Sequence, residues 1–301
     1  MYSLKKISCE NIFQVLHFLK KYEPLCVNLT NEILKQQKYF SLKKNEQKNI
    51  KNKICVSFVF LYKENILAVC ALDRHKTFLH CFPKFDTKVL KKFFACAEIF
   101  FEKFFVKSIM GEKNFNNVLE KFLLKNYTYK IKTSTEYFLL FLNTKNFRSN
   151  FDAALPSECK VNCDVCTRVD LEKLLPLQTG YEREELGHTT PNDFFSRVYL
   201  LSMLKEQTIF KCELNNKIVA KAHTNAGGIN CKQIGGVFTL PEWRGEKFAE
   251  RVLSFAIKTL TPTTKTLVLF VKVKNIKAQK LYKRLGFEKI ADFKIVNFTN
   301  E

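Results

Sequence analysis

Hydrophobic residues in the second half of the chain follow two different periods in turn. From 160 to 168 they alternate with polar residues, and from 248 to 260 they recur every three or four residues, which is typical of strands and helices respectively. The pattern predicts a strand, two helices, three strands, a helix, a strand, a short helix and two final strands. The strands are predicted at 160–168, 208–213, 217–223, 233–240, 266–273 and, for the last two, within 287–298. The helices are predicted at 170–177, from Thr190 onward, at 248–260 and at 275–285.

Two positions refine the paired helices of this pattern. Pro176 lies inside the first helix and is expected to kink or divide it. Thr190 followed by Pro191 is typical of the start of the second helix, with Thr190 as the N-cap residue.

The first half of the chain repeats part of this order in a weaker form. A predicted hairpin and a long helix precede a segment that ends at Asn126 and aligns with the segment that ends at Gly286, so that Phe122 stands opposite Tyr282. The turn before the long helix, 83–87, contains neither glycine nor arginine. The first half therefore resembles a degenerate copy of the second half.

A polar, turn-rich stretch at 143–158 separates the halves. We predict an α/β protein with mixed sheets in two domains, 1–145 and 158–301. The 301 residues, 46% of them hydrophobic, suffice for two cores.

Composition narrows the classes of protein further. No apolar run approaches the roughly 18 residues of a membrane-spanning helix, and the N-terminus lacks the apolar stretch of a signal peptide. Eleven scattered cysteines, an odd number, argue against a disulfide framework. We expect a cytoplasmic protein that does not bind a membrane.

The formal net charge is +21, from 50 Lys and Arg against 29 Asp and Glu. Such an excess favours an anionic partner or reflects a bias toward Lys, Asn, Ile and Phe. The lysines are dispersed through both halves, whereas a nucleic-acid footprint should cluster on one face. We therefore expect no nucleic-acid partner, and the oligomeric state stays open.

The clearest candidate chemistry lies between Gly235 and Leu253. A strand, a sharp basic turn and the start of a helix follow one another there, which places free backbone N–H groups and a positive helix end beside Arg244, as in a phosphate site. A second segment, 275–287, follows at the end of the chain. Together the two segments, with the order of elements around them, resemble the GNAT acyltransferases, which bind acetyl-CoA.

The resemblance implies two GNAT-like domains in tandem, of which the second keeps the site of an N-acetyltransferase. Acetyl-CoA would be the co-substrate, a small-molecule or peptide amine the acceptor, and no metal would take part. The predicted cofactor-binding residues are Val237, Phe238, Thr239, Arg244, Gly245, Glu246, Lys247, Phe248, Ala249, Glu250, Asn275 and Tyr282. Tyr282 would also protonate the leaving thiolate. Lys247 stands where the family pattern has glycine, and it either obstructs the phosphates or adds a cation.

The base that deprotonates the acceptor is less clear, because the strand 267–271 lacks the glutamate that many relatives have there. Glu185, in the acidic segment 181–188 between the two paired helices, is the first candidate, and His223 is the second. In such places a glutamate is more often an ordinary solvated residue, and a histidine more often an ordinary strand residue, than a catalytic base.

Other functions remain open from the sequence. Tandem GNAT folds also serve aminoacyl and longer-acyl transfer, and a module that binds CoA or nucleic acid without catalysis would tolerate Lys247. The spacing of Cys159, Cys163 and Cys166 matches that of iron–sulfur ligands, but the segment alternates like a strand, so we expect no metal there.

Overall fold

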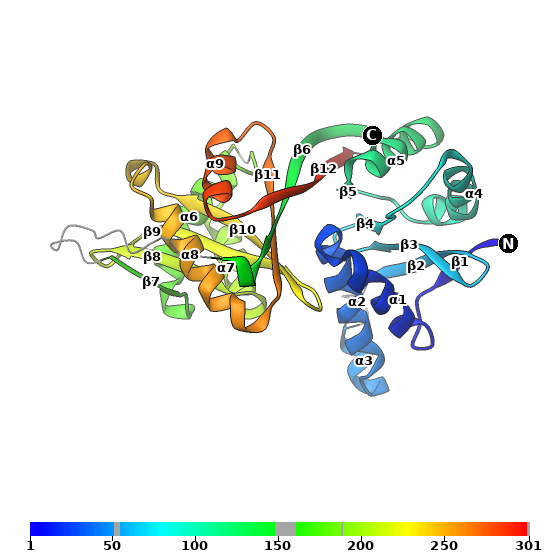
Figure 1. The fold of residues 1–301 in the computed structure, drawn as a ribbon, viewed down its shortest axis with the longest axis horizontal. Coiled ribbons are helices and arrows are strands. Elements are labelled where there is room, and N and C mark those ends of the chain that lie inside the picture. The colour runs from blue at the N-terminus through cyan, green and yellow to red at the C-terminus, as the bar shows by residue number, and fades with distance from the viewer. Residues whose placement is uncertain (51–54, 148–160, 188, 300–301) are drawn as a thin grey trace.

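The computed structural model describes residues 1–50, 55–147, 161–187 and 189–299. Within them, twelve strands form one continuous sheet in the order β1-β2-β3-β4-β5-β12-β6-β11-β10-β9-β8-β7. Figure 1 shows the two halves of the chain side by side, joined by the long strands β6 and β12. None of the helices in these residues is both long and apolar enough to cross a membrane.

The N-terminal half supplies strands from one edge of the sheet and the helices that cover them. Its helices and strands are β1 (Tyr2–Lys6), α1 (Ile12–Tyr22), the 3-10 turn η1 (Glu23–Leu25), α2 (Val27–Phe40), α3 (Lys44–Ile50), β2 (Val56–Tyr62), β3 (Asn65–Leu72), β4 (Thr77–Cys81), α4 (Thr87–Lys103), β5 (Ser108–Glu112), α5 (Lys113–Asn126) and β6 (Lys130–Asn143).

The C-terminal half repeats this order of elements from the other edge. It comprises β7 (Val161–Val165), α6 (Leu171–Glu184), α7 (Asp193–Glu206), β8 (Ile209–Leu214), β9 (Lys217–Gly227), β10 (Cys231–Thr239), α8 (Phe248–Leu260), β11 (Thr266–Lys272), α9 (Ile276–Arg284) and β12 (Glu288–Thr299). The mixed α/β fold and its repetition agree with the sequence-based prediction.

Two local predictions were wrong, and a third is narrowed. A single strand, β12, replaces the two strands expected after Phe287. Helix α6 continues through Pro176, so of the kink or division expected there the division is excluded. Helix α7 begins at Asp193 rather than near Thr190, because the Asn192 side chain accepts hydrogen bonds from the backbone N–H groups of the first turn and so caps the helix.

The halves exchange their last strands. β6, from the N-terminal half, pairs antiparallel with β11 of the C-terminal half, and β12, from the C-terminal half, pairs antiparallel with β5 of the N-terminal half. β6 and β12 also pair with each other. Strand β12 consequently contacts α5 of the N-terminal half (Figure 1). The final strand that each half lacks is therefore supplied by the other half.

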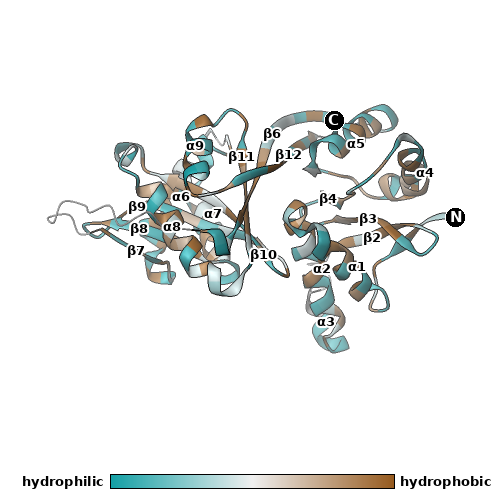
Figure 2. Cartoon of the chain, viewed as in Figure 1, coloured by the Kyte–Doolittle hydropathy of each residue, from teal (hydrophilic) through white to brown (hydrophobic). Residues whose placement is uncertain are grey.

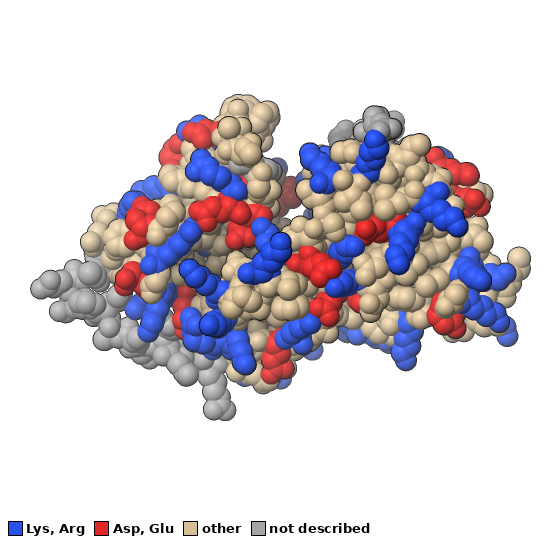
Figure 3. Space-filling model, turned by 90° about the horizontal axis from the view of Figure 1, so that it is seen from above, with Lys and Arg blue, Asp and Glu red and all other residues tan. Residues whose placement is uncertain are grey.

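Hydrophobic residues cover both faces of the sheet in each half. In the C-terminal half, α8 and α9 pack in one cluster with β8, β9 and β11, while α6 packs in a separate cluster that includes Phe238. Figure 2 shows hydrophobic residues along β2 and β3 and a mostly hydrophilic α3. On the face in Figure 3, Lys and Arg side chains lie over both halves, interspersed with Asp and Glu.

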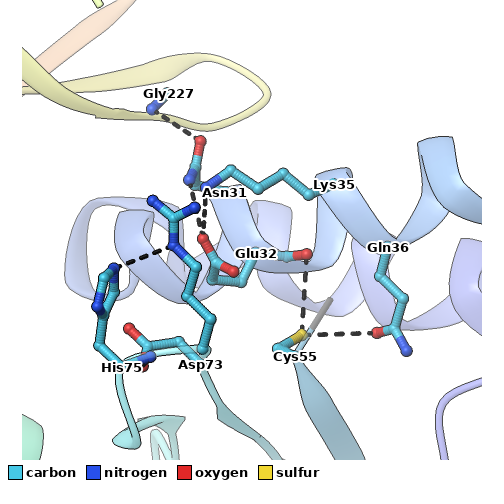
Figure 4. A network of polar contacts seen from close by, with 9 residues as sticks. Asn31, Glu32, Lys35, Gln36, Cys55, Asp73, His75 and Gly227 are labelled. Atoms are coloured by element: carbon cyan, nitrogen blue, oxygen red, sulfur yellow. Dashed lines mark hydrogen bonds and ion pairs between the residues drawn. The ribbon is translucent and has the colours of Figure 1, made fainter. Parts of the chain in front are cut away.

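Helix α2 and the turn η1 hold the hairpin of β9 and β10 against the N-terminal half. The buried Glu23 carboxylate accepts hydrogen bonds from the backbone N–H groups of Ile229 and Asn230, the latter at 2.9 Å. Asn31 of α2 lies against Gly227 at the end of β9 (Figure 4). Burial raises the pKa of Glu23, partly offset by these backbone donors.

Candidate active site

A bulge interrupts the pairing of β9 with β10. Gly235 pairs with His223 and Phe238 with Lys221, so β10 carries one extra residue at this point. Gly236 has a φ of +57°, and a Cβ atom there would lie 1.8 Å from Nε2 of His223. The pair Gly235 and Gly236 permits this bulge, and only glycine fits at position 236.

The pairing of β10 with β11 ends just before this bulge. Their parallel pairing runs from Cys231 to Ile234 and stops before Gly235. The predicted pantetheine-binding residues Val237, Phe238 and Thr239 lie on β10 after that point. The backbone of β10 next to β11 is thus the part of the sheet where an extended ligand can add main-chain hydrogen bonds.

The basic turn leads into a helix whose N-terminus has no side-chain cap. Lys247 is the N-cap residue of α8, with left-handed φ and ψ of 60° and 14°, and no side chain of the described residues caps the helix. Gly245 also has a positive φ, 96°, and Lys247 and Glu246 are exposed. The backbone N–H groups of the first turn, at Phe248, Ala249 and Glu250, therefore face a position suited to an anion.

Arg244 lies beside this helix end but is engaged elsewhere. Its Nη2 donates to both carboxylate oxygens of Glu184 at 2.9 and 2.8 Å, and its Nε donates to the Thr239 carbonyl at 3.1 Å. The guanidinium also lies 5.2 Å from the centroid of the Phe238 ring. A phosphate that binds Arg244 must compete with Glu184, whose side chain is 41% exposed.

Helix α9 carries the two predicted residues of the second segment. The Asn275 side chain accepts from the Ala278 N–H at 3.0 Å, so its oxygen caps the helix and its amide nitrogen is left to donate. Tyr282 is 7% exposed, and burial, with a smaller contribution from Glu185, raises the pKa of its hydroxyl. The Tyr282 phenol is therefore protonated at neutral pH.

Glu185, at the end of α6, is held in an ion pair. Its carboxylate lies 3.0 Å from Lys272 Nζ at the end of β11, and Lys272 also donates to the Glu185 carbonyl. Burial raises the pKa of Tyr137, Tyr181 and Tyr282, and the charge of Glu185 raises each pKa further by a smaller amount. The Glu185 charge therefore acts on Tyr282. His188, from the same acidic segment, lies outside the described residues.

Tyr137, from the N-terminal half, was not predicted from the sequence. It lies on β6 directly opposite Lys272 of β11, in the strand that the halves exchange. No local signal in the sequence indicates this, because the pairing joins segments that are far apart in the chain.

His223, the second candidate base, lies beneath the bulge and is 3% exposed. Its Nδ1 lies 3.2 Å from the Thr224 carbonyl and therefore carries the proton, whereas its Nε2 has no partner among the described residues. Burial, followed by the charge of Lys221, lowers the pKa of His223 to about 3. The imidazole is neutral, with a free lone pair on Nε2.

Lys221 is a second residue that the sequence analysis missed. It is 0% exposed, and its Nζ donates to the Gly236 carbonyl at 3.2 Å. Burial lowers the pKa of Lys221 to about 7. A single lysine within the apolar segment Ile218–Ala222 was the signal that could have identified it.

The equivalent site in the N-terminal half is closed to an anion. The Asp86 side chain accepts from the Val89 N–H at 2.7 Å and so caps α4, placing a carboxylate where the other half offers free N–H groups. Phe122, opposite Tyr282 in the alignment, stacks on Phe94 with centroids 4.2 Å apart. This half is degenerate at both positions.

The cysteine motif does not gather into one cluster. Cys163 packs against the core on the α8 side of the sheet, and Cys166 packs in the separate cluster of α6. Cys159 lies outside the described residues.

Comparison with known proteins agrees with this geometry. A family model described as FR47-like protein matches residues 212–296. No curated protein matches the chain.

Several solved structures are similar over nearly the whole length. They include a Drosophila protein (12% identity, 99% of this chain and 98% of that chain, TM-score 0.68). A tandem GNAT protein from the clavulanic acid biosynthesis pathway (8%, 98% and 98%, 0.60) and a GNAT-family acetyltransferase from Colwellia psychrerythraea (15%, 99% and 100%, 0.53) are also similar. The chain thus has the fold of the GNAT proteins, in two tandem domains.

Proposed function

We propose that the protein is an N-acyltransferase that moves an acetyl group from acetyl-CoA to a small-molecule or peptide amine. The observation that carries this proposal is the uncapped N-terminus of α8 beside the bulge in β10. The degenerate half has a capped helix at the same place, so the contrast within one chain favours a ligand at α8. The FR47-like match and the GNAT fold support acyl transfer in general.

The residues around α8 suit the anionic end of acetyl-CoA. The N–H groups of the first turn and the side chains of Arg244 and Lys247 would hold its pyrophosphate. The β10 backbone at 237–239 would pair with the pantetheine arm, and the Asn275 amide would donate to it. The predicted contacts of the turn therefore involve Arg244, Gly245, Glu246, Lys247, Phe248, Ala249 and Glu250.

The chemical step is direct attack of the amine on the thioester carbonyl. The C–N bond forms, the C–S bond breaks and the thiolate takes the proton of Tyr282, whose phenol is kept protonated by burial. Glu185 would accept the amine proton once its ion pair with Lys272 opens. His223 is the alternative base, because its Nε2 lone pair is free. A pH–rate profile that is unchanged by Glu185→Gln would exclude Glu185.

Binding is tested first by thermal shift with acetyl-CoA, longer acyl-CoAs and CoA. Acetyl-CoA should raise Tm, because a ligand that binds the folded state stabilises it. If no CoA thioester stabilises the protein, the proposal fails, and retention of the protein on DNA or RNA at low salt would then indicate a binding module. A stronger shift with a long acyl-CoA would indicate longer-acyl transfer.

Catalysis is tested next, with a panel of amines and release of CoA as the readout. Tyr282→Phe should lower kcat by roughly 100-fold, within the range for loss of a general acid, and change the Kd for acetyl-CoA much less, by at most about 10-fold, the value of one hydrogen bond. Tyr62→Phe is the matched control, because Tyr62 lies on β2 in the other half and is 42% exposed. Equal activity of the two variants would exclude Tyr282 as the acid.

A further inference from the structure

Lys221 is an unusual residue for the interior of a sheet. Its side chain is fully buried, and its Nζ lies 5.0 Å from the centroid of the Tyr181 ring. The other titratable groups that act on it are Cys166, Glu182 and His223. A lysine in such a place is destabilising unless it is paired, and an aliphatic residue would fill the same volume at lower cost.

No carboxylate in the described residues forms an ion pair with Lys221. Glu182, the acidic neighbour, is engaged by Gln178 at 2.8 Å and by Ser196 at 2.7 Å. The hydrogen bond that Lys221 makes there is with the carbonyl of Gly236, at 3.2 Å. The lysine therefore serves the backbone of the bulge rather than a charge pair.

That carbonyl belongs to the peptide that joins Gly236 to Val237. The described residues contain no cis peptide bond, and in a trans peptide the C=O and the following N–H point in opposite directions. Because Lys221 holds the Gly236 carbonyl on its own side, the Val237 N–H points away from Lys221. Val237 lies in the bulge, between the paired positions Gly235 and Phe238, and beyond the last residue of β10 that pairs with β11.

The location of this peptide links it to the acyl group. If the pantetheine arm runs along 237–239 from a pyrophosphate at α8, its thioester end comes to the start of that segment, at the bulge. A fixed N–H aimed at a thioester carbonyl stabilises the oxyanion that forms when an amine attacks.

We propose that Lys221 is a positioning residue for acyl transfer, which turns the Val237 N–H toward the thioester carbonyl by holding the Gly236 carbonyl. The inference rests on the proposed function, since it presumes acetyl-CoA in this site. It assigns no proton transfer to Lys221 itself and is compatible with either candidate base.

The test compares two ligands that differ at the carbonyl. Acetyl-CoA has the thioester carbonyl, whereas the thioether S-ethyl-CoA lacks it and cannot accept a hydrogen bond. Calorimetry with the full chain should give a preference of roughly 3- to 10-fold for acetyl-CoA in the wild type, the value of one hydrogen bond. Lys221→Met, which has a similar length but no donor, should lose this preference. Lys217→Met is the control, because Lys217 is an exposed lysine of the same strand.

A merely structural lysine would change the binding of both ligands alike and leave their ratio intact. The inference is therefore overturned if Lys221→Met keeps the wild-type preference, or if the wild type binds both ligands equally. If neither ligand binds the wild type, the proposed function fails and this inference fails with it. Should Lys221→Met not fold, Lys221→Gln, which keeps a donor on a shorter side chain, should show a reduced preference.

Discussion

The backbone at Lys247 allows its charge and its conformation to be separated by substitution. Its φ of 60° is left-handed, which costs a non-glycine residue about 1–2 kcal/mol. Glycine relieves that strain but loses about 0.5–1 kcal/mol through the greater freedom of the unfolded chain. Lys247→Gly should therefore be about 0.5 kcal/mol more stable than wild type, whereas Lys247→Ala retains the strain and should not gain stability.

Affinity for acetyl-CoA should behave differently from stability. Both variants remove the same exposed cation from the N-terminus of α8, and such a cation contributes about 0.5–1 kcal/mol, or roughly 2- to 5-fold in Kd. The two variants should therefore bind acetyl-CoA equally, and more weakly than wild type. The difference from wild type should shrink at high salt, since the charge is exposed.

Scanning calorimetry and isothermal titration measure the two effects on the same samples. Lys247→Gly should unfold about 1 °C above wild type, the small shift that a domain of this size gives. The reasoning is refuted if Lys247→Gly is less stable than Lys247→Ala. Tighter binding of acetyl-CoA by Lys247→Gly than by wild type would show instead that the lysine obstructs the phosphates.

Three further outcomes are expected. Glu184→Gln releases Arg244 and should lower the Kd for acetyl-CoA about 2- to 5-fold by calorimetry, an effect that is absent if Glu184 does not compete with phosphate. Because the charge of Glu185, the first candidate base, acts on Tyr137, we expect Tyr137 on the acceptor side of the site. Tyr137→Leu should then raise KM for the amine at least about 5-fold while the acetyl-CoA Kd stays constant, and parallel changes in both would contradict this role. Burial lowers the pKa of His80 to about 4, so the stability it contributes above pH 6.5 is lost as pH falls toward 4, by up to about 1.4 kcal/mol per pH unit. Urea unfolding at pH 7 and pH 5 should show this loss, and His80→Gln should reduce it.

The local elements of the site were predictable because each rests on short-range chemistry. The periodicity of 248–260 is that of α8, and Gly286, with a φ of 86°, ends α9 as the sequence indicated. The left-handed backbone at Lys247 also explains why the family pattern has glycine there. These features depend on residues within a few positions of one another.

The remaining features depend on partners that are distant in the sequence. The alternation in 287–298 indicates strand structure but does not specify which strand it pairs with, so neither β12 as a single strand nor its place beside β5 was foreseen. The sequence marks Lys221 as a lone charge in an apolar segment, but only the bulge in β10 gives that lysine its acceptor. The predicted domain limits, 1–145 and 158–301, stay a prediction.

The exchange of β6 and β12 has a consequence for the order in which the molecule is assembled on the ribosome. Domains generally fold as units from the N-terminus during synthesis. Here β5 lacks its neighbour until β12, which follows every other element, has been made, and β6 has no β11 to pair with until most of the second half exists. The open edges of β5 and β6 thus stay unpaired during much of translation, and exposed edges are sites of wrong pairing. Completion of the first half of this protein must wait for the last strand of the second.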